Sequence, residues 1–131
     1  MTNDKQPLVN DRKFRFLEWE VYKDSKKLFY LILKIVHSLP QEFRFELGNQ
    51  IVRSSFSITL NIAEGSGKAS DKDLNRFFNI ALGSVNETLA GADVLCDNQL
   101  ISRGKFEEIR QMLYSISSQL GGFKKKLASK S

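Results

Sequence analysis

The stretch from Gln50 to Lys68 has the residue spacing of a helix with two apolar faces. At about 100° per residue, one stripe consists of Phe43, Leu47, Ile51, Ser54, Ile58 and Ile62. A second stripe, roughly 140° away, consists of Phe45, Val52, Phe56, Leu60 and Ala63. A surface helix of a monomer needs only one apolar stripe. We therefore expect one face to pack on the chain's own helices and the other to pack on another molecule.

Apolar residues that recur every three or four positions predict four helices in all. The first begins near residues 14–17 and ends just before Pro40, where the second begins. The second is expected to end at a left-handed glycine in residues 65–67. Ser70 and Ser102 stand where N-caps of the third and fourth helices belong.

The fourth predicted helix has the most regular pattern. Its apolar stripe is Phe106, Ile109, Leu113, Ile116, Leu120, Phe123 and Leu127. This alternation of spacings is typical of helices packed in a left-handed bundle. No segment has the alternation of a strand. The sequence thus predicts an all-α protein, an antiparallel up-down-up-down four-helix bundle in residues 14–127. A flexible arm (1–13) would precede it and a basic tail (128–131) would follow it.

The formal charge of +5 belongs to the two ends of the chain. The first 16 residues carry four basic and two acidic side chains, and the last 11 carry four lysines and no acid. The residues between them therefore have a net charge of −1. Basic tails bind RNA or DNA through phosphate, although lysines also favour helix C-termini and solvate tails. The candidate nucleic-acid contacts are Arg12, Lys13, Arg15, Lys68, Arg76, Lys124, Lys125 and Lys126.

No residue pattern indicates catalysis. Gly65-Ser66-Gly67-Lys68 lacks the earlier glycine and the following Ser or Thr of a phosphate-binding loop, because Ile62 and Ala69 occupy those positions. His37 is the only histidine and Cys96 the only cysteine. We therefore expect no metal site, no activated nucleophile, no cofactor and no enzyme activity.

The length indicates the number of domains, and the apolar runs indicate where the protein is located. Its 131 residues suit one domain. No apolar run approaches the ~20 residues that span a bilayer, and the first ten residues lack the apolar core of a signal peptide. We expect a cytoplasmic protein without a membrane partner.

Asn61 is the one amide that falls within the first apolar stripe. We expect it to set the helix register through a buried hydrogen bond. The alternative is a polar site that Asn61 forms with Arg53 or Arg76. Glu64, one turn further on, is placed to pair with Lys68.

Several segments resemble a known family. The run Asn61–Gly65, with Gln50–Arg53 before it and Gly67-Lys68 after it, resembles the four-helix-bundle proteins encoded in 23S rRNA intervening sequences of bacteria. Relatives of that family serve as accessory proteins of diversity-generating retroelements. Further matching segments are Leu17–Trp19, Arg76–Phe78, Ile80–Ser84 and Glu87. The chain departs from the pattern at Thr59, where relatives often have proline, and at Gly91, where they often have glutamine.

The resemblance implies a ring-shaped homopentamer without catalytic activity. The residues expected at its subunit interface are Phe45, Val52, Phe56 and Leu60, with Trp19 at an intersubunit or interhelical seam. Our first hypothesis is a homo-oligomeric nucleic-acid-binding or accessory protein. The second is a scaffold that docks a partner enzyme such as a reverse transcriptase, with RNA contacts secondary.

Overall fold

The structure is a computed structural model, which describes the backbone of residues 13–130 and the side chains of residues 13–123. The arm predicted for residues 1–13 therefore lies, apart from Lys13, outside the described residues. Every regular element in the described part is helical. The elements are η1 (Arg15–Glu18), α1 (Glu20–Ser38), α2 (Gln41–Phe43), η2 (Arg44–Gly48), α3 (Asn49–Ser66), α4 (Asp71–Asp97) and α5 (Arg103–Lys130). The backbone of α5 thus continues past the boundary predicted at residue 127.

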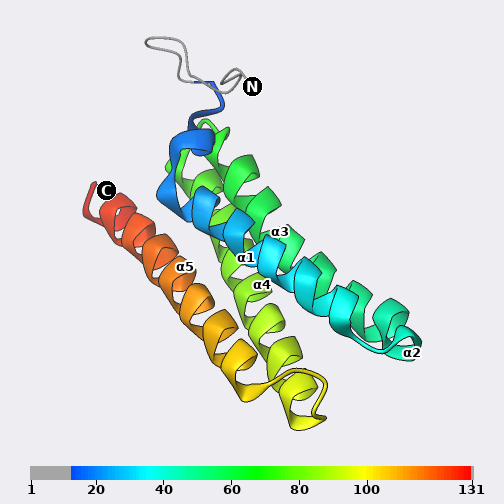
Figure 1. Cartoon of the computed structure of the whole chain (residues 1–131). Helices are drawn as coiled ribbons and strands as arrows, with labels where there is room; N and C mark the ends of the chain where they lie inside the picture. The colour runs from blue at the N-terminus through cyan, green and yellow to red at the C-terminus, as the bar shows by residue number, and fades with distance from the viewer. Residues whose placement is uncertain (1–12, 131) are drawn as a thin grey trace.

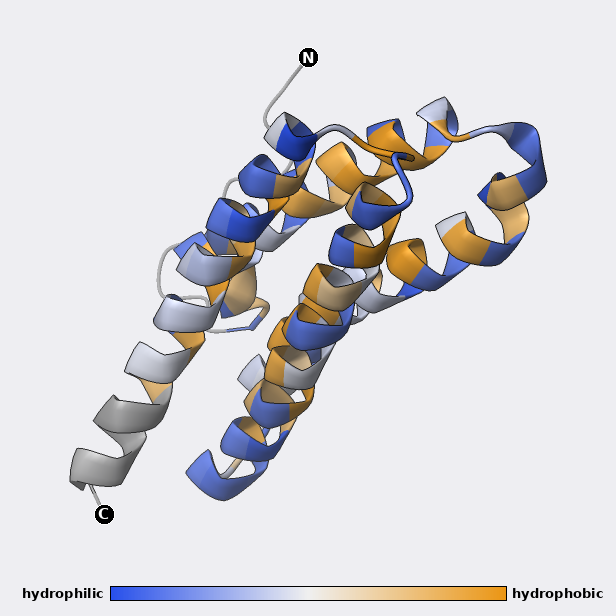
Figure 2. Cartoon of the chain, turned by 90° about the horizontal axis from the view of Figure 1, so that it is seen from below, coloured by the Kyte–Doolittle hydropathy of each residue, from blue (hydrophilic) through white to orange (hydrophobic). Residues whose placement is uncertain are grey.

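The four long helices α1, α3, α4 and α5 form a bundle in which each contacts two others (Figure 1). Helix α3 packs on α1 and α4, and α5 packs on the same two helices. Figure 2 shows apolar residues concentrated on the faces between the helices and polar residues on the outward faces. The all-α prediction is therefore confirmed for the described residues.

The helix starts agree with the predicted caps. The Ser70 hydroxyl accepts a hydrogen bond from the Asp73 amide at 3.1 Å, and the Ser102 hydroxyl accepts one from the Lys105 amide at 3.1 Å. The predicted stripe of α5 is buried from Phe106 to Leu120. Local sequence signals thus place these helices correctly, because caps and periodicity act within a few residues.

Two predicted helix ends differ from the structure. A 3₁₀ turn, η1, comes first, and α1 begins only after Trp19, whose backbone is extended. The end of α3 contains no left-handed glycine: Gly67 has φ −90°, and its amide reaches the Glu64 carbonyl at 3.3 Å. Gly65 instead serves close packing, since a Cβ there would lie 3.1 Å from that of Phe77.

The segment from α2 to α3 is helical throughout, but η2 is a π-helix. Its wider turns shift the helical phase, so Gly48 takes the inward position instead of Leu47. Phe43 and Leu47 are consequently exposed, and the expectation that they belong to the buried stripe was wrong. The stripe is buried from Ile51 onward.

Gly48 lets the η2 segment approach α1 closely. A Cβ at Gly48 would lie 2.7 Å from Cγ1 of Val36, a buried side chain that is stiff at χ1. We expect Gly48→Ala to lower the free energy of unfolding by about 1–3 kcal/mol through overpacking. Urea unfolding followed by circular dichroism measures this loss.

Gly83 in α4 is the matched control. Apart from its chain neighbours and the backbone of its own helix, no atom lies within 4 Å of a Cβ built there. Gly83→Ala should therefore raise the free energy of unfolding by up to about 1 kcal/mol, since alanine is the better helix former. Equal stability of the two variants would contradict the close approach at Gly48.

Hydroxyl groups supply the polar contacts between the helices. Three hydroxyl–hydroxyl bonds of 2.8–3.0 Å join α3 to its neighbours, namely Thr59–Ser25 with α1, and Ser54–Thr88 and Ser84–Ser57 with α4. Small side chains of this kind satisfy one another without a gap in the packing. Thr59, where relatives often have proline, is therefore part of the α1–α3 contact.

Asn61 does not set the register in the expected way. Its side chain is only partly buried, and its Nδ2 donates to the carbonyl and hydroxyl oxygens of Ser57 at 2.8 and 3.0 Å. Both bonds lie within α3. The interhelical bond at this level comes from Ser84, which donates to the Ser57 hydroxyl. The Asn61 amide therefore contacts α4 only indirectly, through the Ser57 hydroxyl.

Candidate functional site

Three distant parts of the chain meet at one end of the bundle. The Arg15 guanidinium in η1 donates to the Ser66 carbonyl at the end of α3, at 3.1 Å. The Trp19 ring packs against Phe78 of α4 and Phe123 of α5, with centroid distances of 6.2 and 5.0 Å. Figure 1 shows the start of η1, the turn between α3 and α4, and the last part of α5 at this end. The fold therefore brings η1, the α3–α4 turn and the last part of α5 to the same end of the bundle.

An open cavity of about 990 Å³, which we call the terminal cavity, lies between η1 and the α3–α4 turn. Its charged lining residues are Lys13, Arg15, Lys68, Glu64 and Asp71. Three of the predicted nucleic-acid contacts thus share one cavity. The N-terminus of α4, whose backbone N–H groups favour negative charge, also borders it.

Lys68 and Arg76 meet on one aromatic ring. The Lys68 ammonium lies 4.9 Å and the Arg76 guanidinium 4.5 Å from the centroid of Phe77. Lys68 also pairs with Glu64 at 3.2 Å, as predicted. Arg76 reaches Asp73 at 4.0 Å and does not line the terminal cavity.

Not all of the predicted contacts can be placed. Arg12 and the side chains of Lys124, Lys125 and Lys126 lie outside the described residues. The backbone of α5 nevertheless runs through 124–126, just beyond Phe123, which packs on Trp19. The backbone of the basic run therefore continues α5 from the end of the bundle where η1 lies.

Phe14 is a cavity residue that the sequence reasoning missed. Its side chain is 69% exposed at the cavity, directly between Lys13 and Arg15. Its backbone is left-handed, with φ 57° and ψ 31°. A bulky residue in this region costs about 1–3 kcal/mol, and such strain is concentrated at functional sites. In the sequence, Phe14 stands between two cations and belongs to none of the apolar stripes, and this is the only signal that could have indicated a site residue.

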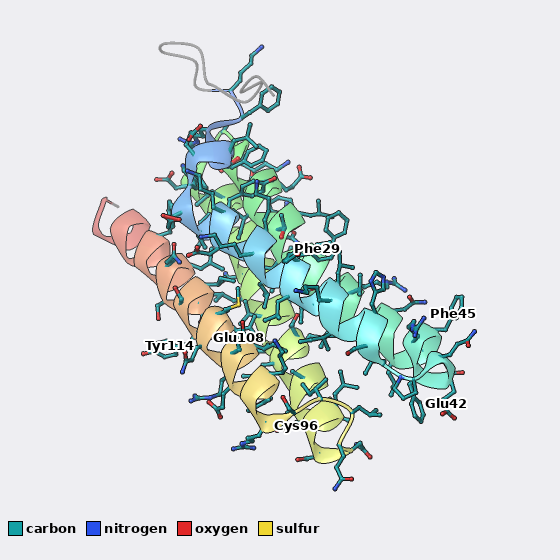
Figure 3. All side chains as sticks on the ribbon, viewed as in Figure 1. Phe29, Glu42, Phe45, Cys96, Glu108 and Tyr114 are labelled. Carbon is teal, nitrogen blue, oxygen red and sulfur yellow. The ribbon has the colours of Figure 1, made fainter. Side chains whose placement is uncertain are left out.

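A second exposed surface lies on α3, η2 and α1. We define the α1–α3 apolar face as Phe29, Phe45, Val52, Phe56 and Leu60. Phe45 is 78% and Phe56 46% exposed, and Leu60 is also exposed. The Phe29 and Phe56 rings pack together with centroids 5.2 Å apart. Figure 3 shows Phe29 midway along the bundle and Phe45 at the end opposite the terminal cavity.

Trp19 does not belong to this face. Its half-buried ring lies against Phe78 and Phe123 of the same chain. The structure therefore places it at an interhelical seam.

The described residues contain no group of three or more His, Cys, Asp or Glu side chains that could hold a metal ion. His37 is exposed, and Cys96 is a partly buried free thiol. Among the helices of the described part, none is long and apolar enough to cross a membrane.

Comparisons with known proteins identify the family of the chain. The family model of the 23S rRNA-intervening sequence protein matches residues 18–122. No curated protein matches the chain. The chain is similar to the crystal structure of a protein of unknown function from the S23 ribosomal protein family of Bacteroides thetaiotaomicron VPI-5482, with a TM-score of 0.72 and 30% identity. The match covers 76% of this chain and 94% of that one. The chain thus belongs to the 23S rRNA-intervening sequence protein family.

Proposed function

We propose that this chain is a non-catalytic, homo-oligomeric protein of the cytoplasm that binds RNA or DNA. The observation that carries the proposal is the gathering of basic residues at the terminal end of the bundle. Lys13, Arg15 and Lys68 line one cavity there, and the backbone of the basic run 124–126 follows on the same end. The rest of the chain is close to neutral, so this end is the place where polyanions are attracted.

The homo-oligomer is supported by the α1–α3 apolar face. A single chain leaves Phe45 exposed on η2, and on α3 it leaves Phe56 and Leu60 exposed one helical turn apart. Contiguous exposed apolar groups of this kind mark protein interfaces. The pentameric ring and the up-down-up-down arrangement are part of the same proposal, and the subunit number rests on the family resemblance. Five copies would add their weak phosphate contacts through avidity.

The test compares nucleic-acid binding by the full-length protein with a variant that lacks residues 1–13 and carries Lys124→Gln, Lys125→Gln and Lys126→Gln. Fluorescence anisotropy with a labelled RNA measures the affinity. The full-length protein should lose about a thousandfold in affinity between 50 and 200 mM salt, because binding releases counterions from phosphate. The variant should bind at least about a hundredfold more weakly at 50 mM salt.

A control variant changes three lysines on α1, as many as the test variant substitutes in residues 124–126: Lys26→Gln, Lys27→Gln and Lys34→Gln. These lysines are exposed but lie outside the terminal cavity, so affinity should change little. Equal loss in both variants would show that only net charge matters. No binding by the full-length protein would instead favour the alternative, a scaffold whose apolar face docks a partner enzyme such as a reverse transcriptase.

A further inference from the structure

We propose that the terminal cavity binds an unpaired nucleotide of a single-stranded nucleic acid, with the Phe14 ring stacked on its base and Lys13, Arg15 and Lys68 at its phosphates. This inference rests on the proposed function and assigns it a site and a substrate class. The cavity, an exposed ring and the cations around that ring support it.

The cavity has the dimensions of a site for a small molecule. Such sites have volumes of about 300–1,000 Å³, and the terminal cavity has about 990 Å³. Part of its lining is apolar, with side chains of Ala63 and Leu74. A flat base can cover such a surface while the sugar and phosphate stay at the open rim.

Phe14 offers the stacking surface. The ring is 69% exposed, and its left-handed backbone holds it at the cavity against the usual preference of a bulky residue. Among the described residues, exposed aromatic rings elsewhere, such as Tyr114, do not line this cavity. Proteins that bind single strands combine a positively charged surface with such rings, because every base presents a π-face. In a duplex the bases are already stacked on each other, so the ring has no base to contact.

The cations around Phe14 are positioned by the fold. Arg15 is held by the Ser66 carbonyl at 3.1 Å and by the Trp19 ring, 5.3 Å from its centroid. A guanidinium has five N–H donors, so donors remain for phosphate after the bond to Ser66. Lys68 is held between Glu64 and the Phe77 ring. The carboxylates of Glu64 and Asp71 repel phosphate from part of the lining, so the phosphates are expected at Lys13, Arg15 and Lys68 and the base nearer the apolar residues.

The first experiment measures the binding of single-stranded and duplex probes to Phe14→Ala in the full-length protein at 50 mM salt. The probes are 12-nucleotide single-stranded RNA and DNA and a 12-base-pair RNA duplex. Phe14→Ala should weaken binding of both single strands by about tenfold and leave duplex binding within about twofold, because only unpaired bases lose a stacking partner. Phe14→Trp should retain wild-type affinity.

Tyr114→Ala is the control, since Tyr114 is 72% exposed on α5 and points away from the bundle (Figure 3). It should bind every probe like the wild type. Unchanged single-strand binding by Phe14→Ala, or an equal loss for the duplex, would overturn the stacking site while leaving the proposed function intact. Failure of the wild type to bind any probe would overturn the proposed function as well.

The second experiment tests the phosphate contacts. Lys68→Gln should reduce the slope of log affinity against log salt by about 0.7 for a single strand, the effect of one lost phosphate contact. Lys105→Gln is matched, because Lys105 likewise pairs with a glutamate close in sequence, Glu108 at 3.5 Å, but lies outside the cavity. It should leave the slope unchanged. An equal slope for wild type and Lys68→Gln would remove Lys68 from the site.

Discussion

Phe56→Asp is expected to dissociate the assembly into single chains of 15.0 kDa that remain folded. In the single chain Phe56 is 46% exposed, so an aspartate there stays hydrated and perturbs only its contact with Phe29. In a subunit interface the same carboxylate would be buried without a partner, at a cost of several kcal/mol. Light scattering at micromolar concentration should give a multiple of the chain mass for the wild type, and we expect five. It should give one chain mass for the variant.

Tyr114→Asp is the control for this change, because it places the same charge at an exposed aromatic residue outside the α1–α3 apolar face. The assembly of the Tyr114→Asp variant should have the same mass by light scattering as the wild type. Circular dichroism should show the same helix content for all three proteins. A wild type that is already a monomer, or a Phe56→Asp variant that keeps the full mass, would contradict an interface at this face.

Phe78→Ala is expected to lower the free energy of unfolding by about 3–5 kcal/mol. The Phe78 side chain is fully buried and contacts the ring of Phe123 edge-on at 5.2 Å and that of Trp19 at 6.2 Å. Its removal leaves a cavity where Trp19, α4 and α5 meet, and the remaining rings cannot fill it. Urea unfolding measures the loss. Trp19 is the only tryptophan, so its fluorescence reports on the same cluster.

Phe77→Ala is the matched control, one residue away on the same helix. Phe77 is only partly buried, and its ring faces Lys68 and Arg76. The free energy of unfolding should fall much less than for Phe78→Ala. Similar losses for both variants would show that the ring cluster around Phe78 does not anchor this end of the bundle.

What could be predicted from the sequence depends on short-range interactions. The caps at Ser70 and Ser102 and the buried stripe of α5 were predicted correctly. A cap joins residues three positions apart, and a stripe repeats every turn, so both are readable without the other helices. The pairing of Glu64 with Lys68 was predictable for the same reason. These signals were enough to determine an all-α chain of four long helices.

The tertiary structure decided the features that depend on distant residues. The π-helix η2 turns Gly48 toward Val36 and leaves Leu47 exposed. The sequence prediction assumed the α-helical rotation of about 100° per residue throughout, so it missed this change in which residues face inward. Asn61 bonds to Ser57 within α3, and the bond to α4 at this level is made by Ser57 with Ser84.

The terminal cavity likewise has no sequence signature. It exists because Arg15 reaches Ser66, 51 residues further along the chain. Charge counts placed the basic residues at the ends of the chain, and only packing brought Lys13, Phe14 and Lys68 around one cavity. The physical reason is that local propensity acts over one or two turns, whereas a cavity is defined by surfaces that meet only when the helices pack.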